Sequence, residues 1–105
     1  MAGAEERFAA LAARLGREQD VSQGTGFGRT PGLRTGGKIF AMLAHGRLVV
    51  KLPRERVDGL VAAGSAERFD PGHGRVMREW ASLDPAAPED WDALAAEARE
   101  FVRPR

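Results

Sequence analysis

The chain has 105 residues, of which 43% are hydrophobic and 30% are charged, a composition typical of one small folded domain and unlike that of a disordered chain. It contains no cysteine, which excludes disulfides, thiolate metal sites and cysteine nucleophiles. The formal net charge is only +1, but ten basic residues and four acidic ones fall in residues 29–78, so a basic block lies between acidic ends.

Residues 4–15 predict an amphipathic helix, because their apolar side chains recur at intervals of three and four along one face. Gly16 is its expected end. The segment starts with acidic residues and lacks the continuous apolar stretch of a secretory signal, and no run in the chain approaches the roughly 18 apolar residues that cross a membrane. We therefore expect one soluble, cytoplasmic domain over residues 1–105, with no membrane contact.

Three consecutive strands are predicted next, at residues 33–35, 38–44 and 47–52. Favoured two-residue hairpin turns join them, Gly36-Gly37 and His45-Gly46. In the third strand Leu48, Val50 and Leu52 alternate with other residues, which predicts that they face the helices. Arg47 and Lys51 then face the other side of the sheet.

A helix over residues 53–63 is predicted to follow, and then a second hairpin with strands at residues 67–70 and 75–83. The last element is an amphipathic helix over residues 88–102, with Asp84 or Ala87 just before its first residue, Pro88. The pattern predicts an α+β fold: an antiparallel sheet of five or more strands with helices packed on one face, in the order α-β-β-β-α-β-β-α. We expect the first and last helices to pack together.

GLRTGGKI (32–39) comes within one residue of the phosphate-binding pattern G-x-x-x-x-G-K-[ST], with Ile39 in place of the hydroxyl that binds magnesium. A phosphate loop lies between a strand and a helix, whereas Lys38 opens a predicted strand and no strand is predicted before Gly32. GTGFGR (24–29) fails as a dinucleotide motif for the same reason, and we interpret it as an irregular lead-in to a sheet edge marked by Pro31. The sequence therefore predicts a Gly-Gly hairpin turn and not a nucleotide site.

Catalytic and metal-binding groups are sparse in the sequence. His45 and His73 fall in separate predicted turns and lack the spacing of a metal site. The carboxylates of ERFD and REW have arginines beside them, which favours surface ion pairs. We expect a non-enzymatic protein with no catalytic residue, no metal ligand and no cofactor.

The chain resembles the MmcQ/YjbR family of small bacterial proteins, which is related to the N-terminal domain of the TfoX competence regulators. The matching segments are GGKIFAMLAHGRLVVKLPRERVDGLVAAG (36–64), RFDPGHGRVMREWASLD (68–84) and the last helix with Trp91, Leu94, Ala98 and Phe101. The resemblance covers the chain from Gly26 onward, through the linked motifs G-G-K-x-F-A, K-L-P and G-x-x-M-x-x-W. It implies a CyaY-like fold and a DNA-binding role that rests on fold similarity to double-wing DNA-binding domains.

The position of Trp80 is left open by the strand at residues 75–83, because two sets of side chains alternate along it. If the odd-numbered residues face the helices, Trp80 lies beside Arg78 on the uncovered face. If the even-numbered residues face the helices, Trp80 belongs to the core.

The basic block supplies the candidate site. On an uncovered sheet face its cations would position phosphates and a tryptophan would stack on bases, and these residues are Arg34, Lys38, Arg47, Lys51, Arg75, Arg78 and Trp80. The leading hypothesis is weak, largely sequence-independent DNA binding by a monomer or weak homodimer. The alternative is a protein-interaction or small-ligand scaffold, in which the same charges form a solvated face. The sequence predicts no particular protein partner.

Overall fold

The computed structural model describes residues 3–25, 30–71, 74 and 76–104. Its helices are α1 (Ala4–Leu15), α2 (Arg54–Ala62) and α3 (Trp91–Val102). Its strands are β1 (Val21–Thr25), β2 (Pro31–Thr35), β3 (Lys38–Ala44), β4 (Arg47–Lys51), β5 (Ala66–Phe69) and β6 (Met77–Leu83). The strands form one antiparallel sheet in the order β1-β2-β3-β4-β6-β5, so the predicted α+β class is confirmed.

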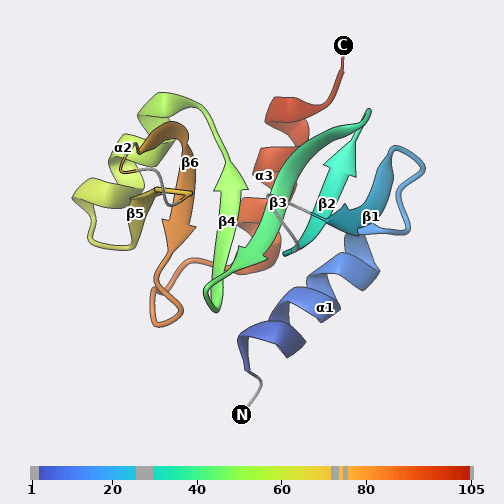
Figure 1. Cartoon of the computed structure of the whole chain (residues 1–105), viewed down its shortest axis with the longest axis horizontal. Coiled ribbons are helices and arrows are strands. Elements are labelled where there is room, and N and C mark those ends of the chain that lie inside the picture. The colour runs from blue at the N-terminus through green and yellow to red at the C-terminus, as the bar shows by residue number, and fades with distance from the viewer. Residues whose placement is uncertain (1–2, 26–29, 72–73, 75, 105) are drawn as a thin grey trace.

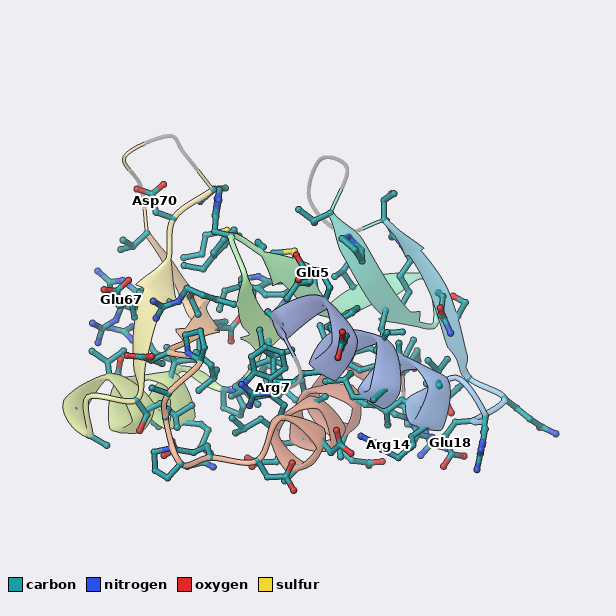
Figure 2. The ribbon with its side chains drawn as sticks, turned by 90° about the horizontal axis from the view of Figure 1, so that it is seen from below. Glu5, Arg7, Arg14, Glu18, Glu67 and Asp70 are labelled. Atoms are coloured by element: carbon teal, nitrogen blue, oxygen red, sulfur yellow. The ribbon has the colours of Figure 1, made fainter. Side chains whose placement is uncertain are left out.

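The helices of the described chain all lie on one side of the sheet, as Figure 1 shows from the strand side. Figure 2, seen from below, has the helices beneath the sheet, while the β1–β2 and β5–β6 hairpins rise at its two ends. The face opposite the helices is here called the open face and is defined by Arg34, Ile39, Met42, Val49 and Trp80. This face is the one on which the sequence predicted a candidate site.

The helix side of the sheet holds the larger apolar cluster, in which Leu48, Val50 and Leu52 are buried as the alternation of β4 predicts. α1 and α3 contribute Leu11 and Leu94 to it, and α2 adds Leu60. The first and last helices also contact each other, as expected: Arg14 forms an ion pair with Asp92, and the Arg7 guanidinium lies 3.8 Å from the centroid of the Trp91 ring.

The start of α3 lies later in the chain than predicted. Asp90 is the N-cap, and its side chain accepts a hydrogen bond of 2.9 Å from the backbone N–H of Asp92. Asp84 instead accepts from the backbone N–H of Ala86 in the preceding turn. The expected start at Pro88 is therefore wrong, because the capping carboxylate two residues later satisfies one of the free N–H groups of the first turn.

β1 is a strand that the sequence patterns did not predict. It pairs with β2 along its whole length, from Val21 opposite Thr35 to Thr25 opposite Pro31. It forms the edge of the sheet, so the interpretation of Pro31 as the edge marker is wrong, and a strand does precede Gly32. Residues 26–29 of the GTGFGR stretch lie outside the described residues.

The predicted hairpin turns are confirmed. Gly36 and Gly37 both have positive φ, at 57° and 80°, as a two-residue turn between twisted strands requires. His45 and Gly46, at 55° and 71°, form the same kind of turn between β3 and β4. GLRTGGKI is therefore a strand, a turn and a strand, which is not the geometry of a phosphate loop.

Asp20 links the two layers on the helix side. Its carboxylate accepts hydrogen bonds from the Thr35 hydroxyl at 2.8 Å and from Nε of Arg99 at 2.9 Å. The bond from Arg99 is the main reason that the pKa of Asp20 lies well below its usual range. The ionised carboxylate of Asp20 therefore joins the segment before β1 to strand β2 and to helix α3.

Candidate functional site: the open face of the sheet

The open face carries its own apolar cluster, although no described helix covers it. Its buried members are Met42, Ala44, Val49, Phe69 and Trp80, with Ile39 and Met77 packed against them. Val49 lies between two cationic residues of β4 and is fully buried. The central strands are therefore buried on both sides, and the cations of the open face surround an apolar cluster.

Trp80 lies on the open face and is nevertheless only 5% exposed. It pairs with Lys51 across β4 and β6. A register shift between Arg68 and Phe69 breaks the alternation of β6, so that Met77 and Trp80 join the same cluster. The first predicted alternative is right about the face, because Ala81 and Leu83 lie in the helix-side cluster and Trp80 lies opposite them. Trp80 is nevertheless buried on the open face and is not exposed there. With so little of its ring exposed, it is not placed to stack on a base.

Arg47 reaches across the open face from β4 to β6. Its Nε donates to the Ser82 hydroxyl at 2.9 Å, and Nη2 donates to the Ser82 carbonyl at 3.0 Å. These acceptors are neutral, so they fix the guanidinium without cancelling its charge.

Arg34 is held in a similar way at the other end of the sheet. It pairs with Ile39, which packs against the open-face cluster. Its Nη1 donates to the Gly37 carbonyl and its Nη2 to the Thr25 carbonyl, both at 3.1 Å. Arg34 therefore also presents a fixed positive charge bound only to neutral acceptors.

Lys51 and Arg78 line a groove of about 600 Å³ on the same face. We call it the Trp80 groove, and its lining residues are Lys51, Pro71, Val76, Met77, Arg78, Glu79 and Trp80. Arg34, Arg47, Lys51 and Arg78 together are the open-face cations. They come from strands β2, β4 and β6, which the sheet order places across the middle of the face.

Two other predicted site residues do not join this group. Lys38 pairs with Thr35, whose side chain bonds to Asp20 on the helix side. Directly paired residues share a face of the sheet, so the Lys38 side chain lies on the helix side as well. Lys38 is the first residue after the turn. The alternation of apolar side chains was used for other strands and did not assign its face. Arg75 lies outside the described residues.

Five arginines of the helix side have carboxylate partners, whereas Arg7 and Arg54 form no ion pair with a described residue. The ion pairs are Arg14–Asp92, Arg56–Glu97, Arg68–Asp58, Arg99–Asp20 and Arg103–Glu100. Arg68 of the ERFD segment pairs with Asp58 of α2, which lies outside that hairpin. None of the open-face cations forms an ion pair with a described residue.

Acidic side chains gather at the β5 end of the open face. Glu67 pairs with Ser82 in the sheet register, and Figure 2 shows Glu67 and Asp70 together at this end, far from the β1–β2 hairpin. Glu79 lines the Trp80 groove. The positive part of the face therefore extends over β2 and β4 and weakens toward β5.

Groups for metal chemistry do not gather anywhere in the described ranges, which contain no cluster of three His, Asp or Glu residues able to hold a metal ion. His45 is exposed in its turn, and His73 lies outside the described residues. Within the same ranges, none of the helices has the length and apolar character needed to cross a bilayer.

Known proteins give no independent guide to this face. Comparisons of the chain with protein-family models, with curated proteins and with solved structures return no match. The function must therefore be argued from the arrangement of the open-face side chains.

Proposed function

We propose that the protein is a small non-enzymatic DNA-binding module of the cytoplasm whose open face binds the phosphate backbone. The observation that carries the proposal is the grouping of four cations on the open face without an ion pair to a described residue. Arg34 and Arg47 bond to neutral acceptors, and Lys51 and Arg78 line the Trp80 groove, whereas five arginines of the helix side are paired with carboxylates. A surface that holds charge in this way favours an anionic partner.

Phosphate contact is the chemistry that these side chains support best. Arg34 and Arg47 are oriented by their bonds to the sheet, so little side-chain freedom is lost when a phosphate is bound. Four cations that each neutralise one phosphate give a slope of about −3 to −4 when log affinity is plotted against log salt. Binding of this kind is weak and insensitive to sequence.

Base stacking is not part of the proposed interface, because Trp80 is buried in the open-face cluster. The interface therefore consists of charged side chains above an apolar floor. This arrangement supports contact with the backbone of a duplex and not the reading of unpaired bases.

The resemblance to the MmcQ/YjbR family forms part of the same proposal. It implies an antiparallel sheet with helices on one face, and the protein has a sheet of this general kind, with β1 in addition to the predicted strands. The lack of cysteine suits a reducing compartment, which supports the proposed cytoplasmic location.

A salt titration tests the proposed function. The fluorescence anisotropy of a labelled duplex of about 20 base pairs is followed with protein at salt concentrations from about 25 to 200 mM. The double variant Arg34→Gln/Lys51→Gln should bind more weakly and have a slope shallower by about 2, because two phosphate contacts are lost. Arg47 is left in place because it bonds to Ser82 across two strands.

The matched control is Arg14→Gln/Arg56→Gln, which removes the same charge from the helix side, where both arginines are ion-paired. It should leave the slope unchanged. Absence of binding at the lowest salt concentration, or equal losses in the two double variants, would refute the proposal. The scaffold alternative would then be favoured.

A further inference from the structure

The Trp80 groove combines apolar walls with cations at its rim. Val76, Met77, Pro71 and Trp80 line it, and the side chain of Val76 is 52% exposed. Among the described residues only Val76 and Phe101 are large apolar residues with such exposure. The backbone N–H of Leu52 donates to the Glu79 carbonyl at 2.9 Å, so one wall is tied to the end of β4.

We propose that this groove binds an amphipathic carboxylate, with its acyl chain along Val76, Met77 and Trp80 and its carboxylate at Lys51 and Arg78. The groove volume of about 600 Å³ lies within the range of small-molecule sites, which is about 300 to 1,000 Å³. The inference goes beyond DNA binding and does not rest on it.

The charges of the lining select the head group. Lys51 and Arg78 form no ion pair with a described residue, and among the described lining residues Glu79 alone carries a carboxylate. A neutral apolar occupant would remove water from two cations without offering them a partner, which is unfavourable. A carboxylate offers both of them charge-assisted hydrogen bonds.

The apolar walls select the tail. A bare phosphate or a short carboxylate would contact the two cations and leave Val76 in water. Each methylene group that an acyl chain buries against the groove strengthens binding about fourfold. The ligand is therefore distinguished from the DNA backbone, which brings negative charge but no aliphatic chain.

Isothermal titration of the full chain with decanoate tests the proposal. Decanoate should bind, and octanoate should bind about fifteenfold more weakly because two methylene groups are lost. Decan-1-ol and decyltrimethylammonium should bind at least about tenfold more weakly because they lack the carboxylate. Equal binding of decanoate and decan-1-ol would overturn the proposal, and so would absence of a signal for decanoate.

Two substitutions locate the site. Arg78→Gln should weaken decanoate binding about tenfold through loss of a charged hydrogen bond, and Val76→Gln should weaken it through loss of apolar contact. Both residues are exposed, so the fold should tolerate the changes. The matched controls are Arg17→Gln and Phe101→Gln, which remove an exposed charge and an exposed apolar side chain outside the groove. Equal losses in variants and controls would contradict the assignment.

The two proposals fail separately. Val76→Gln changes no charge, so it should leave DNA affinity and its salt slope unchanged. Arg34 does not line the groove, so Arg34→Gln should weaken DNA binding and leave decanoate binding unchanged. Loss of decanoate binding in Arg34→Gln would show that the ligand does not occupy the Trp80 groove.

Discussion

Gly36 is a residue at which one added methyl group has two separate consequences. Its φ of 57° lies in the left-handed region, and a Cβ atom there would come 2.4 Å from Cγ of Pro104 in the C-terminal segment. Gly37 has φ of 80°, but a Cβ atom there would meet nothing within 4 Å. The neighbouring glycines therefore separate backbone strain from steric overlap.

We predict that Gly36→Ala destabilises the protein more than Gly37→Ala does. Each alanine incurs about 1–2 kcal/mol for the left-handed conformation, and only the first also displaces Pro104. Urea unfolding measures both free energies. Adding Pro104→Ala should bring Gly36→Ala to the level of Gly37→Ala, and equal effects of the two single substitutions would contradict the contact.

Asp20 makes the stability of the fold depend on pH. Its pKa is lowered from the ordinary value of 3.8, chiefly by the hydrogen bond from Arg99. The ionised carboxylate therefore stabilises the folded protein above that value, and the contribution is lost as the pH falls below it.

We predict that Asp20→Asn is less stable than the natural sequence at about pH 7 and that the difference shrinks toward about pH 2. Urea unfolding of both proteins across this range provides the measurement. A difference that stays constant with pH would mean that the Asp20 carboxylate is not preferentially ionised in the folded state.

At the scale of the elements, the turns and the alternating strands were the predictable part of the fold. Gly36-Gly37 and His45-Gly46 indicated their hairpins because few residues accept positive φ, and Leu48, Val50 and Leu52 indicated the buried side of β4. β1 was missed because four of its five residues are exposed and its last four give no apolar alternation.

The candidate site was predictable only in part, for the same physical reason. Alternation correctly placed Arg47 and Lys51 on the open face, but it assigns a face only while the register is regular. The register shift in the β5–β6 hairpin put Met77 and Trp80 in one cluster, and no pattern in the sequence marks that shift.

The turn between β3 and β4 contains the one described non-glycine residue with positive φ, His45. We predict that His45→Asn stabilises the protein by about 0.5 kcal/mol, because asparagine tolerates this conformation better, and that the β-branched His45→Val destabilises it. Thermal unfolding of both variants measures the effect. The same midpoint for asparagine and valine would show that the turn is not strained at this residue.

At the scale of the whole molecule, the sheet divides the protein into two electrostatically different sides. Ion pairs hold five arginines of the helix side, while on the open face four cations lie above an apolar cluster without an ion pair to a described residue. The acidic residues at the β5 end limit the positive region to the middle of the sheet and the β1–β2 end (Figure 2). The proposed DNA contact therefore has a defined place on the molecule.

Mapping that contact by NMR tests the central claim most directly. A short duplex is titrated into nitrogen-15-labelled protein at low salt, and the amide shifts are followed residue by residue. We predict that the largest shifts occur at and beside Arg34, Arg47, Lys51 and Arg78, and that added salt reverses them. Shifts centred on α1 and α3, or shifts that persist at high salt, would contradict binding of the phosphate backbone by the open face.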